Sequence, residues 1–245
     1  MGVLNVTPDS FSDGGRWLDP AAAVAHGLQM VAEGADVVDV GGESTRPGAE
    51  PVPVDEELRR VLPVVEALAP HVRVSIDTRK AEVAEAALGA GATIVNDVSA
   101  TLAPVAKAAG AGWVAMHMQG DPATMQQAPA YDDVVAEVTA FLVARAGAAG
   151  IDEVWIDPGI GFGKTLAHNL SLLRHLDRLV ATGYPVLVGT SRKTFLGRLT
   201  GGAGADDRVE ASVATAAWAL SQGASMVRVH DVAPTVAAAR LLSAP

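Results

Sequence analysis

The sequence predicts an α/β fold in which eight parallel strands alternate with helices, the (β/α)8 or TIM barrel, as a single domain over residues 1–245. Short apolar runs alternate with Ala-rich stretches of helical character along the whole chain. The length of 245 residues is close to the roughly 250 residues typical of this barrel. An open, doubly wound parallel sheet is the alternative, because periodicity does not report whether a sheet closes.

A weak internal repeat marks three of the strands. It reads GADVVD at residues 34–39, GATIVN at 91–96 and GASMVR at 223–228. In each copy a helical stretch ends at glycine, which readily adopts the left-handed conformation after a helix, and a short β-branched or apolar run follows. Helix, turn and strand are therefore the expected repeating unit.

The remaining elements follow the same order. Further strands are expected at residues 3–6, 72–77, 112–116, 154–157 and 185–188. Helical segments are expected at about 20–33, 55–69, 79–89, 102–109, 132–149, 165–181, 206–222 and 232–243. Asp19 precedes Pro20 as a capping residue, and the acidic run that begins at Asp55 favours a helix N-terminus.

Composition narrows the classes of function. Acidic residues outnumber basic ones, 28 to 18, and the formal charge of −10 argues against a broad basic surface for nucleic acid. The absence of cysteine excludes disulfides, a thiolate nucleophile and a cysteine-ligated metal. No apolar stretch approaches the roughly 18 residues that span a bilayer. We expect a cytoplasmic protein that binds neither nucleic acid nor membranes.

Polar residues end six of the predicted strands. They are Asn5, Asp39, Asp77, Asn96, Asp157 and Arg228. An unpaired buried polar group costs about 1–3 kcal/mol, so these residues need partners. All strand carboxyl ends of a barrel meet at one rim, where the active site lies. A helix cap is the competing interpretation for any single one, Asp77 in particular, but it explains six together poorly.

The polar residues suggest a pocket with two different ends. Glycine-bearing loops at residues 7–15 and 41–48 are typical of lids or anion-contacting loops. The candidate anion-binding residues are Arg46, Lys193, Arg228 and His230. The candidate acceptors for a nitrogen-rich ring are Asp39, Asp77, Asn96 and Asp157. The run PGIGFGKT at 158–165 fails the phosphate-loop pattern, because Pro158 replaces its first glycine.

These residues lie in motifs that resemble the dihydropteroate synthases of the folate pathway, from Met1 to about Leu241. The motifs, in family order, are GVLNVTPDSFSDGG, VDVGGESTRPG, SIDT, VND, MHMQGDP with TMQQAP, DPGIGFGK, VGTSRK and RVHDV. The resemblance implies a TIM barrel that condenses 6-hydroxymethyl-7,8-dihydropterin pyrophosphate with 4-aminobenzoate, giving 7,8-dihydropteroate and pyrophosphate. It also implies Mg2+ as the cofactor and a homodimer.

The resemblance assigns roles to individual residues. Asn5 would ligate the Mg2+ bound to the pyrophosphate. The residues placed around the pterin are Asp77, Asn96, Met116, Asp157, Phe162 and Lys193. Arg228 and His230 would bind the pyrophosphate. The loop residues are Thr45 and Arg46 over the site, with Phe11 and Pro47 as the clamp on aminobenzoate. Ser191 and Thr194 lie where the family begins the helix that receives the aminobenzoate carboxylate.

The implied mechanism is a dissociative one. Loss of pyrophosphate leaves positive charge on the pterin methylene, which carboxylates such as Asp13 and Asp77 would stabilise. Mg2+, Arg228 and His230 would stabilise the leaving anion, and the neutral aromatic amine then attacks. The expected catalytic residues are Asp13, Asp77, Lys193, Arg228 and His230.

Other functions are conceivable for the same residues. A non-catalytic pterin-binding paralogue would keep the pocket, but it should have lost residues such as Asn5, Lys193 or Arg228, and all are present. A Schiff-base aldolase would use Lys193 or Lys164 on the barrel rim. A corrinoid-dependent methyltransferase of the pterin-binding superfamily would not need the predicted pyrophosphate cluster.

Overall fold

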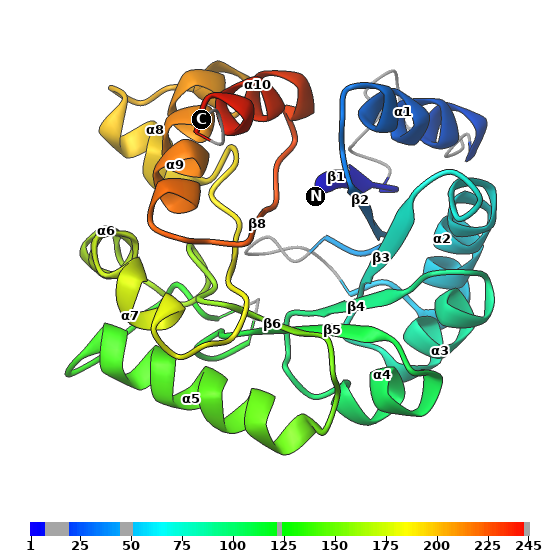
Figure 1. The fold of residues 1–245 in the computed structure, drawn as a ribbon, viewed down its shortest axis with the longest axis horizontal. Coiled ribbons are helices and arrows are strands. Elements are labelled where there is room, and N and C mark those ends of the chain that lie inside the picture. Colours follow the sequence, from blue (N-terminus) through cyan, green and yellow to red (C-terminus); the bar gives the residue numbers. More distant parts are fainter. Residues whose placement is uncertain (8–19, 45–50, 122–123, 243–245) are drawn as a thin grey trace.

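A computed structural model describes residues 1–7, 20–44, 51–121 and 124–242, and the statements below refer to these residues. The strands, in chain order, are β1 (Gly2–Asn5), β2 (Val37–Gly41), β3 (Arg73–Asp77), β4 (Ile94–Asp97), β5 (Gly112–Met116), β6 (Val154–Asp157), β7 (Leu187–Val188) and β8 (Met226–Val227). All eight predicted strands form. The helices lie in a ring around them (Figure 1).

The strands close into a barrel. Strands β1 to β6 pair in parallel in chain order, and β7 pairs in parallel with β8. Single parallel bridges join the two sheets, between Ile156 and Val186 and between Gly2 and Val229. The backbone amide of Val3 also donates to the carbonyl of Val229 at 2.9 Å. The first and last strands are therefore neighbours, which confirms the predicted barrel and rules out the open sheet.

The helices are α1 (Pro20–Ala32), α2 (Val54–Leu68), α3 (Ala81–Gly89), α4 (Ala103–Ala109), α5 (Val134–Ala149), α6 (Leu166–Arg174), α7 (Leu176–Val180), α8 (Thr194–Leu199), α9 (Val209–Ser221) and α10 (Val232–Leu242). A 3-10 turn, η1 (Asp206–Arg208), precedes α9. None of the helices in the described ranges has the length and apolar character needed to cross a membrane.

Two of the predicted helical segments differ from the structure. The segment expected at 165–181 is two helices, because His175 leaves helical geometry with φ −113° and ψ 32°. Buried leucines continue on both sides of the break, so periodicity does not reveal it. The segment expected at 206–222 opens with η1. Helix α8 was not among the predicted segments, since its six residues are too few to show a period.

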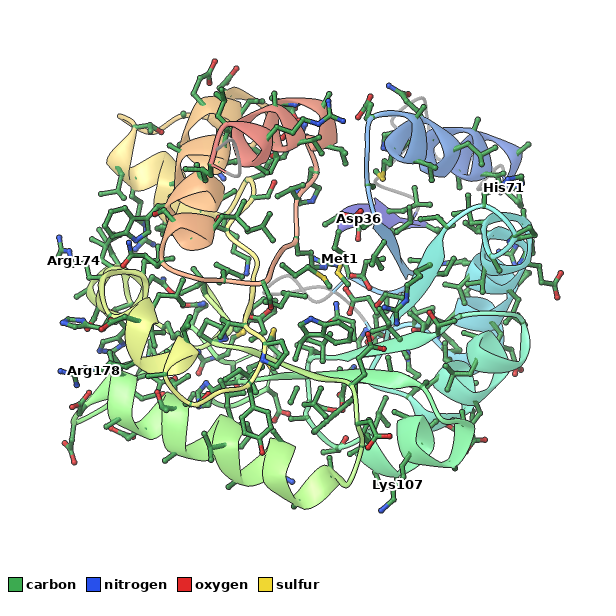
Figure 2. All side chains as sticks on the ribbon, viewed as in Figure 1. Met1, Asp36, His71, Lys107, Arg174 and Arg178 are labelled. Carbon is green, nitrogen blue, oxygen red and sulfur yellow. The ribbon has the colours of Figure 1, made fainter. Side chains whose placement is uncertain are left out.

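The barrel has two apolar regions, one on each face of its strands. The larger lies between the strands and the surrounding helices. The smaller consists of Met1, Val37, Ile94, Val114, Trp155 and Leu187, with Met226 packed against it. Figure 2 places Met1 near the centre of the ring, whereas Lys107 and Arg174 lie at its periphery. We conclude that the smaller cluster fills the barrel interior.

The interior cluster explains the polar strand ends. Val37, Ile94, Trp155 and Met226 each precede, by two positions, the residues Asp39, Asn96, Asp157 and Arg228. Side chains alternate between the two faces of a strand, so residues two apart point the same way. The polar side chains therefore lie inside the barrel, directly above an apolar layer.

Candidate active site

The register of the first four strands aligns the polar ends Asn5, Asp77 and Asn96 in one row. Asn5 pairs with Gly41, Gly41 with Asp77, and Asp77 with Asn96. On the next strands the row continues through Val114 and Trp155, and Met116 pairs with Asp157 two residues further along. Neighbouring strands lie about 4.8 Å apart, so these residues share one rim of the barrel. The residue before α3 is Lys80 rather than Asp77, so the structure does not support the helix-cap interpretation of Asp77.

A small cavity opens among these side chains. Its lining comprises Asp77, Asn96, Val98, Met116, Asp157, Phe162, Gly189, Lys193 and Arg228. Apart from Val98 and Gly189, these are residues expected at the pterin or the pyrophosphate. The cavity volume of about 40 Å³ is close to that of one water molecule, so a two-ring ligand requires side chains to move aside.

Arg228 lies between two carboxylates in this cavity. Its Nε donates to Oδ2 of Asp39 at 2.6 Å, and its Nη2 donates to Oδ2 of Asp77 at 2.7 Å. Burial raises the pKa of Asp77 to about 7, with Arg228 acting in the opposite direction. Burial by itself lowers the pKa of Arg228, but Asp39 and Asp77 outweigh it, and the pKa lies above its ordinary value. Arg228 therefore stays a cation.

Asp39 was predicted as an acceptor for a nitrogen-rich ring, but it does not line the cavity and instead pairs with Arg228. It is fully buried, and its Oδ2 also accepts from Nδ2 of Asn96 at 2.9 Å. Its Oδ1 has no hydrogen-bond partner among the described residues. Asp39, Asn96 and Arg228 occupy the same position in the three copies of the repeat. That shared position is the signal that could have identified Asp39 as the anchor of Arg228.

Asp157 and Lys193 form the opposite side of the cavity. Oδ1 of Asp157 accepts from the amide of Gly159 at 2.7 Å, and burial raises the pKa of this carboxyl. Nζ of Lys193 donates to the carbonyl of Ile160 and lies 4.8 Å from the ring centre of Phe162. Burial lowers the pKa of Lys193 to about 8, although the carboxylate of Asp157 acts against that shift.

The loop after β6 packs its backbone closely against the segment after β5. Gly159 has φ +64°, and a Cβ atom there would lie 1.9 Å from the carbonyl oxygen of His117. Nζ of Lys164 ties the two segments together by donating to the carbonyls of His117 at 3.2 Å and Phe162 at 3.0 Å. The same Nζ lies 3.0 Å from Nδ1 of His117, and burial lowers the pKa of Lys164 to about 7. The glycines of this loop thus serve close packing.

Several predicted site residues lie beside the cavity rather than in its lining. Oγ of Ser191 accepts from the backbone amide of His230 at 3.0 Å and lies 3.0 Å from Nδ1 of the same residue. Thr194 is exposed as the first residue of α8, and Asn5 is partly buried at the end of β1. The residues Phe11, Asp13, Thr45, Arg46 and Pro47 lie outside the described ranges, as does Asp19. Their roles stay predictions.

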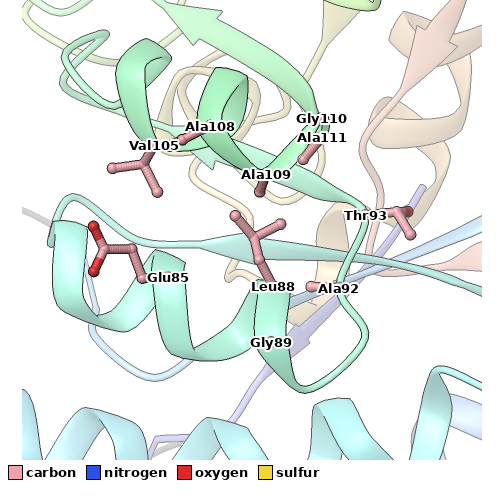
Figure 3. A pocket seen from close by; sticks show the side chains of 10 residues that line it. All are labelled: Glu85, Leu88, Gly89, Ala92, Thr93, Val105, Ala108, Ala109, Gly110 and Ala111. Carbon is pink, nitrogen blue, oxygen red and sulfur yellow. The ribbon is translucent and has the colours of Figure 1, made fainter.

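A larger cavity, of about 490 Å³, lies between α3 and α4. Figure 3 shows Leu88 and Val105 facing each other across it, with Glu85 at one end. Its lining contains no cationic side chain. It therefore suits the predicted anionic substrate poorly, and we assign the chemistry to the smaller cavity at the strand ends.

Comparisons with known proteins show the family of this chain. A family model described as "Pterin binding enzyme" matches residues 1–230. The dihydropteroate synthase of Mycobacterium leprae is 54% identical over 261 residues, covering 100% of this chain and 92% of that protein. The chain belongs to the dihydropteroate synthase family. The family predicted from the sequence motifs is therefore confirmed.

Solved structures of dihydropteroate synthases match the barrel closely. The Yersinia pestis enzyme, in a sulfonamide drug complex, matches with a TM-score of 0.92 at 46% identity, covering 98% of this chain and 91% of that one. The Xanthomonas albilineans enzyme with 4-aminobenzoic acid gives 0.91 at 50% identity, covering 100% and 93%. The same enzyme with 7,8-dihydropteroate gives 0.88 at 48% identity, again covering 100% and 93%.

Among the described residues, Asn5 has an oxygen donor of the kind that the Mg2+ predicted from the resemblance would need. No three His, Asp or Glu side chains within the described ranges gather into a metal site of their own. The carboxamide of Asn5 offers an uncharged oxygen at the end of β1, two strands from Asp77. Mg2+ prefers oxygen donors and commonly keeps waters and substrate phosphates as its other ligands. A single amide oxygen suits a metal that arrives with the pyrophosphate.

Proposed function

We propose that this protein condenses 6-hydroxymethyl-7,8-dihydropterin pyrophosphate with 4-aminobenzoate, giving 7,8-dihydropteroate and pyrophosphate. The observation that carries the proposal is the cavity in which hydrogen-bond acceptors face the cations Lys193 and Arg228. Close relatives bound to 4-aminobenzoic acid and to 7,8-dihydropteroate support both the second substrate and the product.

The acceptors suit the amino-pyrimidinone edge of a pterin. Asp157 uses Oδ1 for Gly159, and its Oδ2 makes no hydrogen bond to a described residue. Asn96 donates through Nδ2 to Asp39, which leaves its amide oxygen as an acceptor. A carboxylate can accept two parallel hydrogen bonds from adjacent N–H groups. The ring would therefore bind through Asp157 and Asn96, with Met116 and Phe162 as apolar neighbours.

Charge stabilisation accounts for the reaction. The bond between the pterin methylene and the pyrophosphate oxygen breaks, and its electron pair leaves with the pyrophosphate. The positive charge that develops on the methylene is stabilised by the conjugated ring and by Asp77. The neutral amine of aminobenzoate then forms the new C–N bond and afterwards loses a proton to water. No strong base is required.

Arg228 and His230 would receive the leaving pyrophosphate. Arg228 uses Nε and Nη2 for Asp39 and Asp77, so its Nη1 can donate to a phosphate oxygen with both pairs intact. His230 lies beyond the end of β8, beside Ser191. The proposed Mg2+, held by Asn5 and the substrate, would neutralise part of the pyrophosphate charge when bound.

Release of pyrophosphate tests the proposal. With both substrates and Mg2+, we expect multiple turnovers, and we expect activity to drop when either aminobenzoate or Mg2+ is left out. A protein that binds the pterin pyrophosphate but releases nothing would be the non-catalytic paralogue. Borohydride with a carbonyl substrate should leave Lys193 and Lys164 unmodified, and a trapped adduct would favour the aldolase instead.

The homodimer and the cytoplasmic location are also proposals. Large apolar side chains are exposed on neighbouring C-terminal helices, at Leu199 of α8, Trp218 of α9 and Leu241 of α10 (Figure 1). Burying such side chains against a second copy is favourable. Light scattering should give twice the mass of the chain, and a Trp218→Glu variant should shift the protein toward the monomer.

A further inference from the structure

Two basic residues of the site, Lys193 and His230, follow the two shortest strands of the barrel. Strands β7 and β8 contain two residues each and pair only through Leu187 with Met226 and Val188 with Val227. Lys193 and His230 both lie beyond these ladders. Contacts outside the sheet must therefore hold these two side chains in place.

Arg192, between Ser191 and Lys193, has an unusual backbone conformation. Its φ is +58°, in the left-handed region, where Ala100 is the other non-glycine residue of the described ranges. This conformation costs a non-glycine residue about 1–2 kcal/mol. It persists only where the surroundings hold it.

Four residues hold Arg192. Its Nε and Nη2 donate to the two carboxylate oxygens of Asp231 at 3.0 and 2.6 Å, and its Nη1 donates to Asp206 at 3.0 Å. Its amide donates to Oγ of Ser212 at 2.9 Å, and its carbonyl accepts from Nη1 of Arg208 at 2.8 Å. The pairing with Asp231 matches the planar guanidinium fork, which lysine does not reproduce.

We propose that Arg192 is a positioning residue, whose paired contact with Asp231 holds the left-handed turn that directs Ser191 to His230 and Lys193 into the cavity. Asp231 directly follows His230, so one ion pair joins the segments after β7 and β8. Neither Arg192 nor Asp231 lines the cavity, so the pair acts through its neighbours. The inference rests on the proposed function, because turnover is its main readout.

Comparing alanine and glycine variants of Arg192 distinguishes an effect on the placement of Lys193 from an effect on the stability of the fold. Both Arg192→Ala and Arg192→Gly remove the guanidinium, so we expect both to lower kcat at least tenfold. Glycine adopts positive φ freely, so the glycine variant should have the higher Tm of the two. If Lys193 leaves its partly buried position, its pKa returns toward 10.5, so the fall of activity at alkaline pH should move to higher pH in both variants.

The partner residue and a matched control complete the test. Asp231→Asn should reproduce the loss of kcat, Arg192→Lys should recover little, and Arg192→Ala with Asp231→Ala should be no worse than the single changes. Arg73 forms a similar two-bond pair with Glu153 at 2.9 and 2.7 Å, at the beginning of β3 and so at the opposite end of the barrel. Arg73→Ala should leave kcat unchanged.

The two failures are distinguishable. Absence of pyrophosphate release by the unchanged protein would contradict the proposed function. If Arg192→Gly or Asp231→Asn releases pyrophosphate as fast as the unchanged protein and with the same pH profile, the positioning role is wrong. The proposed function then still stands. Full recovery by Arg192→Lys would also overturn the positioning role, since charge without the fork would then suffice.

Discussion

Nε of Arg228 lies 2.6 Å from Oδ2 of Asp39, although the two residues are 189 positions apart in the chain. The same arginine reaches Asp77 at 2.7 Å, and Asn96 donates to the shared oxygen of Asp39 at 2.9 Å. The three equivalent positions of the sequence repeat therefore meet inside the barrel. Their contact supports both the stability of the barrel and the placement of Arg228 in the site.

Removal of Arg228 should affect stability and turnover together. Arg228→Ala leaves the buried carboxylate of Asp39 and the partly buried carboxylate of Asp77 without their cation, which costs about 3–5 kcal/mol. For a chain of this size we expect Tm to fall by on the order of 10 °C. Turnover should fall more than tenfold, measured by pyrophosphate release. Adding Asp39→Asn should recover part of the lost stability, and an unchanged Tm in Arg228→Ala would contradict the arrangement.

Lys193 should give the activity an alkaline limit. Burial lowers its pKa to about 8, so kcat/KM should fall above pH 8 as Nζ loses its proton. Lys193→Ala should lower turnover more than tenfold. Lys193→Arg stays charged at every accessible pH, so the fall near pH 8 should disappear from its profile. If the fall of kcat/KM near pH 8 persists unchanged in Lys193→Arg, the titrating group is a residue other than Lys193.

The same shift predicts how stability depends on pH. The pKa of Lys193 in the folded protein is below its ordinary value of 10.5, so the charged lysine costs stability at pH values below about 8. That cost is relieved as the pH rises from 8 to 10.5. The stability of the wild type relative to Lys193→Met should therefore increase over this interval, which urea unfolding at several pH values can measure.

Variants of Asp157 should distinguish the role of its charge in turnover from its role in holding the loop after β6. Asp157→Asn keeps an oxygen that can accept from the amide of Gly159, so the loop after β6 should stay in place. Burial disfavours the charge of Asp157, so the asparagine variant should be at least as stable at pH 7. Its turnover should nevertheless fall more than tenfold. Asp157→Ala should lose turnover and also Tm, and wild-type turnover in Asp157→Asn would remove the carboxylate from the mechanism.

Gly159 should tolerate no side chain. In Gly159→Ala, the new Cβ would lie 1.9 Å from the carbonyl of His117, so the backbone beside Asp157 must shift. Gly183 is a matched control, because its φ is also positive, at +85°, and no atom lies within 4 Å of a Cβ built there. Gly183→Ala should cost only about 1–2 kcal/mol from its conformation. Gly159→Ala should cost clearly more in urea unfolding and should lower kcat as well.

Asn5 should set the requirement for Mg2+. Asn5→Ala removes the proposed protein ligand but leaves the substrate phosphates and waters. The Mg2+ concentration that gives half-maximal pyrophosphate release should therefore rise several-fold, with turnover recovering at saturating Mg2+. Calorimetry of 4-aminobenzoate binding in the presence of pyrophosphate should show the same dependence on Mg2+. An unchanged Mg2+ titration would exclude Asn5 as a ligand.

Sequence reasoning succeeded where the signal is local. Asp77, Asn96 and Asp157 were recognisable as polar residues that end short apolar runs, and the structure brings all three into one cavity. It was less successful where partners are distant. Glu57 was interpreted as a charge that favours the start of a helix, yet it is fully buried and accepts from Oγ1 of Thr78 at 2.8 Å and from Lys80.

The left-handed turn at Arg192 also escaped the sequence, because arginine rarely adopts positive φ and nothing in the adjacent residues predicts it. Its cause lies in Asp231, Ser212 and Arg208, which reach it from other parts of the chain. The break at His175 is similar, since the apolar period runs through it.

The amino-acid sequence by itself determined the order of strands and helices, the polar strand ends and the family, because apolar runs, helix ends and motif order are properties of neighbouring residues, whereas closure of the sheet into a barrel is visible only in the structure. Tertiary structure decided which charges meet. Arg228 pairs with Asp39 and Asp77, and Arg192 with Asp231, because closure between β8 and β1 and the register of the strands bring these groups within hydrogen-bond distance. Such pairings depend on three-dimensional distance, which a linear pattern does not encode.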